Sequence, residues 1–276
     1  MTFEPRSIPL SLSYYTVPEL APPAMVRAAA AAGFRFVGLR LLNGQPGRDP
    51  APLLEDATLR RETLACLRDT GLNALDASGA RLIPDTDMTA FAPFLETAAT
   101  MGARHILTTG DDPDRSRLLA RFAQLCGQAE EFGLSVDLEF VPWMTISNLA
   151  TAAEVVREVG CANFGIAVDA LHFDRSRSRP EDVAALPVNW FRYVQLCDAP
   201  GEFRRDRDAL LHAAVSERLF PGEGAIDLVA LLRALPRDIP VALEIPTATL
   251  AQTIPAAQRL RRAVAATRNV LAMAYG

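Results

Sequence analysis

The sequence contains no lysine, so all 28 of its basic residues are arginine. A lysine amine is the nucleophile of Schiff-base aldolases and holds the cofactor of pyridoxal phosphate enzymes, so both classes are excluded. A Walker-type phosphate loop is excluded too, because its lysine contacts the phosphates.

Histidine and cysteine are also scarce, with three and four residues. The cysteines have no paired spacing, and most lie in apolar patterns: Cys66, Cys126, Cys161 and Cys197. Disulfide frameworks and zinc sites use regular cysteine spacings. We therefore expect buried free thiols in a reducing compartment, and a cytoplasmic protein.

Long apolar runs and an excess of positive charge are missing as well. No stretch approaches the roughly 18 apolar residues that cross a membrane. The opening residues, MTFEPRSIPLSLSYY, lack the pattern of a secretory signal. The net charge is −5, which leaves no basic excess for a nucleic-acid backbone. We expect neither a membrane nor a nucleic acid as partner.

Half of the 276 residues are apolar, and short apolar runs bounded by glycine or proline alternate with helical patterns. The predicted strands are residues 8–14, 34–42, 72–78, 104–109, 134–140, 164–169, 191–198 and 241–246. The predicted helices are residues 19–32, 58–70, 88–101, 112–132, 147–159, a short one after Pro180, 226–235 and 250–272. Asp112 and Ser147 are the expected N-caps of the fourth and fifth helices. Residues 199–224 form the longest irregular segment.

Eight strand–helix units in order predict an α/β protein with a single (β/α)8 TIM-barrel domain over residues 1–276. Such a barrel takes about 250 residues. Its chemistry lies where the strands end, at the carboxyl-terminal mouth.

Each of the last four predicted strands carries an oxygen donor near its end. These donors are Glu139, Asp169, Gln195 and Glu244. Parallel strands would bring them together at one mouth. Burying several anions near each other is costly, and a divalent cation is the simplest compensation. An all-oxygen set suits Mg²⁺ or Mn²⁺, with Co²⁺ or Zn²⁺ as further options. The alternative is that each carboxylate is separately hydrogen-bonded or paired with an arginine.

This ordered set resembles the xylose isomerase-like family of sugar phosphate isomerases and epimerases, over almost the whole chain. The motifs are Glu139 in DLEF, Asp169 with His172 in DALH, Gln195 in VQLCD and Glu244 in ALEIP. LFPGEGAIDL, residues 219–228, also resembles the family's segment that leads into the last crossover helix. The resemblance implies that the family's four metal ligands correspond to Glu139, Asp169, Gln195 and Glu244.

Many isomerases and epimerases of that family have histidine where this chain has Gln195. An amide oxygen makes the site harder and favours Mg²⁺ or Mn²⁺. In this respect the chain is similar to the family's 3-dehydroshikimate dehydratases, so a dehydratase acting on 3-dehydroshikimate or an inosose is the alternative to an isomerase or epimerase of a small sugar or keto-polyol.

Both activities begin with proton abstraction next to a metal-bound carbonyl. By resemblance, Glu139 and Glu244 exchange that proton. His172 would contact the substrate or act as an acid or base, and in a dehydratase it would protonate the leaving hydroxyl. A satisfied loop histidine is the other reading of His172.

Further candidates surround the predicted mouth. Arg40 and Arg205 are the first choices to bind a substrate carboxylate or phosphate, and Trp143 and Tyr14 could form a wall of the pocket. Asp198 either supports the metal site from behind or caps its own strand. Two broader alternatives remain: a non-catalytic binding module that kept the fold, and a homo-oligomer whose neighbour completes the site.

Overall fold

The computed structural model describes residues 7–44 and 52–276. Its centre is a closed barrel of eight parallel strands in sequence order, with β1 paired to β8. The strands are β1 (Leu10–Leu12), β2 (Phe36–Gly44), β3 (Asn73–Leu82), β4 (His105–Gly110), β5 (Ser135–Glu139), β6 (Phe164–Asp169), β7 (Val194–Leu196) and β8 (Val241–Leu243). The predicted (β/α)8 barrel is confirmed.

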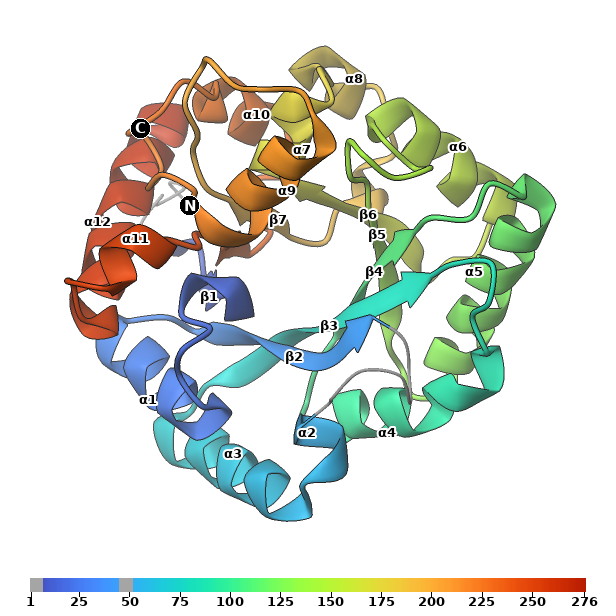
Figure 1. The fold of residues 1–276 in the computed structure, drawn as a ribbon, viewed down its shortest axis with the longest axis horizontal. Helices are drawn as coiled ribbons and strands as arrows, with labels where there is room; N and C mark the ends of the chain where they lie inside the picture. The colour runs from blue at the N-terminus through green and yellow to red at the C-terminus, as the bar shows by residue number, and fades with distance from the viewer. Residues whose placement is uncertain (1–6, 45–51) are drawn as a thin grey trace.

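Helices surround the barrel as an outer ring (Figure 1). They are α1 (Pro22–Ala32), α2 (Pro52–Glu55), α3 (Ala57–Thr70), α4 (Ala92–Thr100), α5 (Arg115–Glu130), α6 (Leu149–Val159), α7 (Ala170–Arg175), α8 (Pro180–Ala184), α9 (Arg207–Ser216), α10 (Leu228–Ala234), α11 (Ala248–Ala251) and α12 (Ala256–Tyr275). Short 3-10 turns are η2 (Tyr14–Thr16), η3 (Met88–Phe91) and η4 (Val188–Trp190). Among the described residues, no helix is both long and apolar enough to span a bilayer.

Both predicted N-caps are wrong, by two residues and by one residue. The N-cap of α5 is Asp114, whose side chain accepts from the Arg117 backbone N–H, and not Asp112. Asp112 is instead fully buried and pairs with Arg117 and Arg121. Asn148, not Ser147, caps α6, because it forms a capping box with Thr151.

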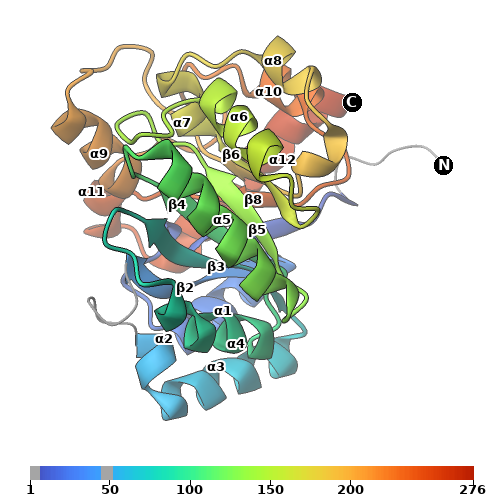
Figure 2. The ribbon, with the colours of Figure 1, turned by 90° about the vertical axis from the view of Figure 1, so that its right-hand side faces the viewer.

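Helix α9 is the larger difference, because its residues fall in the segment that the sequence analysis treated as irregular. Asp206 caps the helix through the backbone N–H of Ala209. Figure 2 shows α9 and α11 at one end of the molecule, the end at which the strands finish. This end is the mouth of the barrel.

The opposite end of the barrel is closed by a buried polar cluster. Asp137 accepts from Arg192 Nη1 at 2.7 Å and lies 3.1 Å from His105 Nδ1. His105 Nδ1 also lies 2.7 Å from Ser135 Oγ. These contacts give His105 a structural role remote from the mouth. Arg192 and Asp137 also pack against Gly165 of β6 so closely that no larger side chain fits there.

A Gly165→Ala substitution tests how tightly this cluster is packed. A Cβ there would lie 2.5 Å from the Trp190 carbonyl oxygen and 3.0 Å from Asp137 Oδ1. We expect the free energy of unfolding to fall by about 3 kcal/mol, measured by urea denaturation. Gly127→Ala in α5 is the control, since its Cβ meets nothing within 4 Å. It should be neutral or stabilise by up to about 1 kcal/mol, and equal losses in both variants would contradict the packing argument.

Candidate active site

A cavity of about 290 Å³ opens at the mouth of the barrel. Strands β2 to β5, the segment after β5 and helix α9 provide most of its lining. The lining residues used below are Tyr15, Arg40, Ser78, Arg81, Thr109, Glu139, Trp143, His172, Arg207, Leu211, Ala214, Val215, Arg218 and Glu244.

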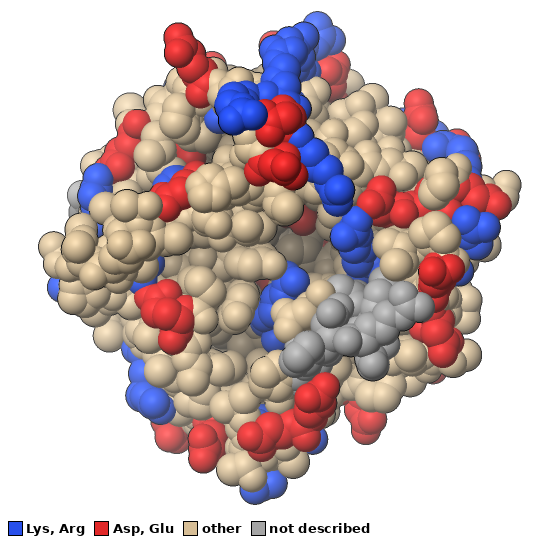
Figure 3. Space-filling model, viewed as in Figure 1, with Lys and Arg blue, Asp and Glu red and all other residues tan. Residues whose placement is uncertain are grey.

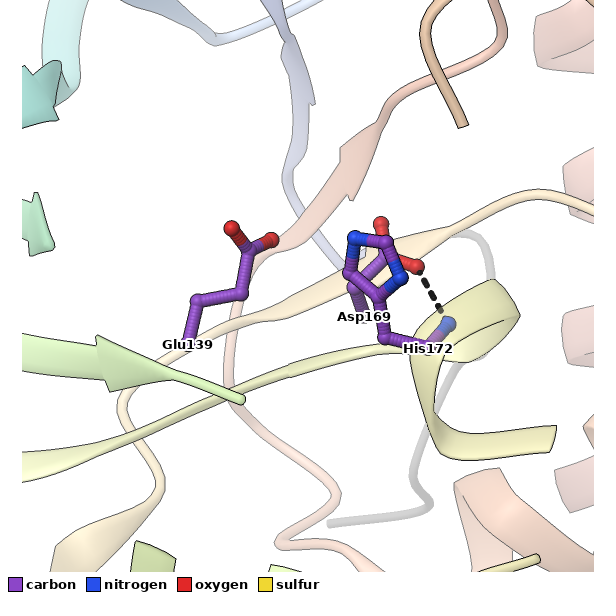
Figure 4. Close-up of side chains that lie close together, drawn as sticks. All are labelled: Glu139, Asp169 and His172. Carbon is purple, nitrogen blue, oxygen red and sulfur yellow. Dashed lines mark hydrogen bonds between the residues drawn. The ribbon is translucent and has the colours of Figure 1, made fainter. Parts of the chain in front are cut away.

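The four predicted ligands come from neighbouring strands. Asp169 pairs with Gln195 in the β6–β7 ladder, and Gln195 Nε2 donates to Glu244 Oε1 at 3.1 Å. Ligand atoms of Glu139, Asp169 and His172 all lie within 4.8 Å of one another. Figure 4 shows the His172 ring against the Asp169 carboxylate, with the Glu139 carboxylate to the left of both. The structure therefore brings the predicted donors to one place.

Arg218 lies between two of these donors. As one of several arginines in the long segment after β7 it was a possible anion-binding residue, and its pairing with the carboxylates was not predicted. It is 4% exposed, and its Nη1 donates to Asp169 Oδ2 at 2.5 Å. Its Nη2 donates to Glu244 Oε2 at 2.9 Å, and its Nε donates to the carbonyl of Ala214 at 2.9 Å. Asp169 and Glu244 are thus paired with an arginine, which was the alternative to a metal site. They share one arginine, however, and both lie at the barrel mouth.

The environment separates the protonation behaviour of the three carboxyls. Burial raises the pKa of Glu139, and the charges of Glu244 and Asp169 raise it further. Burial and Asp169 bring the pKa of Glu244 to about 7, against the opposing charge of Arg218. Burial is the largest influence on Asp169 and opposes its ionisation, but the charge and hydrogen bond of Arg218, together with His172, lower that pKa below its usual value. Two of the three carboxyls therefore need more positive charge than Arg218 supplies.

The donor set fits a divalent cation. Gln195 Oε1 is buried and has no hydrogen-bond partner among the residues described, and a buried acceptor without a partner is costly. For Glu139, too, neither an ion pair nor a side-chain hydrogen bond is found within residues 7–44 and 52–276. An unsatisfied amide oxygen beside carboxylates is the chemistry that a hard cation binds. Glu139, Asp169, Gln195 and Glu244 would hold it.

His172 is 5% exposed and is the third residue of α7. Its ring and that of Trp143 meet edge-on, with centroids 5.3 Å apart. Its backbone N–H donates to Asp169 Oδ1 at 3.0 Å, and its Nδ1 has no partner in the described part of the chain. Burial lowers the pKa of its imidazole to about 4, with Arg218 adding to the shift and Asp169 opposing it. A neutral imidazole can donate or accept a hydrogen bond at pH 7, but it is a weak proton donor.

Of the four residues predicted to contact the substrate from around the mouth, two line the cavity and two do not. Arg40 and Trp143 line the cavity; the Arg40 guanidinium lies 4.9 Å from the centre of the Tyr15 ring. Tyr14 lies outside this lining, in a neighbouring hollow near α1, and its successor Tyr15 occupies the cavity wall. Arg205 is exposed beside Phe203 and is not part of the lining.

Asp198 supports the site from behind. Its carboxylate accepts from the backbone N–H groups of Ala199, Gly222 and Ile226, at 2.8, 3.0 and 3.1 Å. Its backbone also pairs with Leu219, the residue that follows Arg218. Asp198 therefore fixes the loop that holds Arg218 against the carboxylates, which goes beyond a strand cap.

A further buried carboxyl, Asp76, lies inside the barrel. A Cβ on Gly38 of the next strand would lie 2.8 Å from Asp76 Oδ1, and Oδ2 has no partner among the described residues. Burial, and then the charges of Glu244 and Asp137, raise the pKa of Asp76 to about 7. Nothing in its sequence context, LNALDAS, distinguished it from an ordinary strand residue.

A closed parallel barrel with acidic and amide side chains gathered at its carboxyl-terminal mouth defines a TIM-barrel protein with a strand-end site. Residues 26–270 match the model of the xylose isomerase-like TIM barrel family, and the chain belongs to this family. The resemblance drawn from the four strand ends is confirmed at this level.

The curated relatives include two kinds of enzyme. The inosose isomerase of Bacillus velezensis is 28% identical over 188 residues, which cover 61% of this chain and 62% of that protein. The 3-dehydroshikimate dehydratase of Pseudomonas aeruginosa is 31% identical over 115 residues, which cover 40% of this chain and 17% of that protein. The matches therefore span less than two thirds of either relative.

Solved structures share the fold. The IOLI protein with a bound zinc atom has a TM-score of 0.77 at 21% identity, over 98% of this chain and 99% of that chain. The probable 3-DHS dehydratase AsbF of Bacillus anthracis has a TM-score of 0.72 at 17% identity, over 96% of this chain and 99% of that chain. At these identities the likeness shows the barrel architecture.

An Asp76→Asn substitution should change how stability depends on pH. The folded state keeps the Asp76 proton up to about pH 7, whereas the unfolded chain loses it near pH 4. Between these values the folded state binds more protons, so this carboxyl lowers stability as pH rises. We expect the variant to exceed the native protein by about 2–4 kcal/mol at pH 8 and by much less at pH 4, in urea unfolding. Asp69→Asn, on the exposed face of α3, controls for the substitution, and a pH-independent difference would contradict the assignment.

An Arg218→Gln substitution should make stability depend on a divalent cation. Without Arg218, Asp169 and Glu244 remain buried without their counter-charge, which costs about 3–5 kcal/mol. Mn²⁺ should then raise the melting temperature of the variant more than that of the native protein, because binding to the folded state is linked to stability. Unfolding is measured with EDTA and with Mn²⁺. Arg262→Gln removes an exposed pair with Glu223 and is the control; an equal response to Mn²⁺ in all three proteins would count against a shared site.

Proposed function

We propose that the protein is a divalent-metal-dependent enzyme that isomerises or epimerises a small sugar or keto-polyol by moving a proton next to a carbonyl. The single observation that carries this proposal is the convergence of Glu139, Asp169, Gln195 and Glu244 at the barrel mouth. Glu139 and Glu244 line the cavity there, and Gln195 Oε1 has no hydrogen-bond partner among the described residues. The bound cation would act as a Lewis acid on the substrate carbonyl.

The chain's own residues supply the proton transfers. Both Glu139 and Glu244 line the cavity, and the pKa of Glu244 lies near 7, so that carboxyl exchanges protons readily at neutral pH. Glu139 takes the proton next to the carbonyl and Glu244 returns one, and the reverse assignment differs only in which face of the substrate reacts. Arg218, held by Asp169 and Glu244, presents a fixed positive charge beside the developing oxyanion.

His172 orients the substrate. Its ring is held by Trp143 and by the turn that Asp169 caps, and its Nδ1, which has no partner among the described residues, can hydrogen-bond a hydroxyl of the substrate. A neutral imidazole hydrogen-bonds a hydroxyl without protonating it. The enclosed position of the ring also keeps bulk water from that side of the reacting carbon.

A dehydratase is the second candidate. Gln195 in place of histidine favours it, as does the local match to a 3-dehydroshikimate dehydratase. It would use the same first proton abstraction and then expel a β-hydroxyl. The neutral state of His172 makes this residue a poor source of the leaving group's proton, so the acid would be Glu244 in its protonated form.

Deuterium exchange separates these functions. The Mn²⁺-loaded protein is incubated in D2O with an inosose or with 3-dehydroshikimate. An isomerase or epimerase should incorporate deuterium next to the carbonyl, followed by NMR, whereas a dehydratase should produce a conjugated product that absorbs in the ultraviolet. Glu139→Gln and Glu244→Gln should each slow exchange by about 10²-fold or more.

The surface substitution Glu223→Gln is the matched control and should leave exchange unchanged. Exchange that survives in the double Glu139→Gln, Glu244→Gln variant would sink the proton-transfer assignment. Protein that binds both Mn²⁺ and a keto-polyol but exchanges no deuterium would be the non-catalytic module. Metal analysis of protein prepared without chelators checks the cation independently.

A further inference from the structure

One face of α9 forms a wall of the cavity. Arg207, Leu211, Ala214, Val215 and Arg218 all line it, at the spacing of one side of a helix and its last turn. Leu211 and Val215 are each 40% exposed, although both are apolar. The wall therefore offers an apolar centre with an arginine at each end. An apolar centre of this kind suits the C–H face of a small ring.

The opposite side of the cavity is polar and also carries arginines. Arg40 of β2 and Arg81 of β3 line it together with Ser78 and Thr109. Arg81 Nη2 donates to Asp111 Oδ2 at 2.5 Å, and Asp111 Oδ1 accepts from the backbone N–H and hydroxyl of Thr145 at 3.0 and 3.1 Å. Arg81 is thus held in position before any ligand arrives. We call Arg40, Arg81 and Arg207 the rim arginines.

The charges at this mouth differ from those of the whole chain, whose net charge is −5. Figure 3 shows a row of basic side chains that runs from the edge of this face to the hollow at its centre, with acidic side chains beside the outer part of that row and around the periphery. Arg204, Arg205 and Arg207 are all exposed in the segment that leads into α9. Within the described ranges no carboxylate is paired with Arg207. Such a field attracts anions toward the cavity.

Charge balance inside the cavity points the same way. The four arginines of the lining are offset by Glu139 and Glu244, by Asp169 behind them and by Asp111 on Arg81. A divalent cation at the carboxylates would then leave two positive charges uncompensated. A neutral keto-polyol does not change this total, because the proton that it loses stays in the cavity on Glu139. A substrate that carries a carboxylate or phosphate group brings the missing negative charge with it.

We propose that the rim arginines bind an anionic group of the substrate, so that the keto-polyol acted on here is a carboxylate or a phosphate ester. That the bound anion is a substrate rests on the proposed function. Anion binding itself rests only on the arginines that line the cavity. The keto group lies at the carboxylate end, the apolar ring face lies on Leu211 and Val215, and the anionic group lies at the rim. Arginine suits both anions, because its guanidinium donates two parallel hydrogen bonds.

Binding of compounds that lack a carbonyl tests the site without turnover. Quinate and myo-inositol are cyclic polyols of similar size, the first anionic and the second neutral. Their binding to the Mn²⁺-loaded protein is measured by calorimetry. Quinate should bind at least about tenfold more tightly, as expected for one charge-assisted contact, and added NaCl should reduce that preference.

Arg81→Gln and Arg207→Gln should each weaken quinate binding by about tenfold and leave myo-inositol within about twofold. Arg115→Gln, which removes an exposed pair with Glu158 on α5, is the matched control and should change neither. Thermal unfolding confirms that each variant is folded. Inorganic phosphate, added as a competitor, distinguishes the anions: displacement of quinate by a lower concentration of phosphate assigns a phosphate ester, and the reverse assigns a carboxylate.

Equal affinity for quinate and myo-inositol, undetectable quinate binding, or a preference that survives in both arginine variants overturns the anion site. Failure of the proposed function looks different. In that case the protein exchanges no deuterium or holds no metal, while the preference for quinate and its loss in the two variants remain when binding is repeated without Mn²⁺.

Discussion

The cost of burying three carboxyls at the mouth of one barrel governs the rest of this structure. Glu139, Asp169 and Glu244 lie at or just beyond the ends of strands β5, β6 and β8. Asp169 and Glu244 are buried, and Glu139 is half-buried at the cavity wall. Each would pay a large desolvation penalty as an isolated anion. Arg218 compensates Asp169 and Glu244 directly, and the carboxyl that it does not reach, Glu139, is left with a raised pKa.

The surrounding architecture serves that compensation. Arg218 follows α9, and the loop after it is held by two backbone hydrogen bonds, from Gly222 and Ile226, to the buried carboxylate of Asp198. Helix α9 is thereby held across the mouth with one face in the cavity. The same segment thus provides the counter-charge of the carboxylates, an apolar wall and Arg207 at the rim. The charge compensation of the carboxylates and the shape of the cavity therefore depend on the same segment, α9 and the residues that follow it.

The barrel could be predicted because its signals are local. Apolar runs bounded by glycine and proline, repeated eight times, indicate strands and helices wherever they pack. The N-caps of α5 and α6 were predicted wrongly because several adjacent residues can cap a helix, and the choice among them depends on tertiary contacts. The Asp112 carboxylate, for example, forms ion pairs with Arg117 and Arg121 and is not the cap of α5. Helix α9 was missed because arginines and aspartates before it resemble a polar loop, although RDALLHAAVS is itself a good helix sequence.

The sequence alone determined the order of the eight units, the oxygen donors near the ends of the last four strands and the absence of any amine chemistry. These features follow from the residue types and from the spacing of apolar residues, and both can be read directly from the sequence. Only the tertiary structure decided which charges meet. Arg218 contacts Asp169 and Glu244 from 49 and 26 residues away, Tyr15 rather than Tyr14 faces the cavity, and Asp76 is enclosed by the barrel. Such pairings depend on the closure of the barrel and on side-chain direction, because an electrostatic interaction is set by distance in space and by burial.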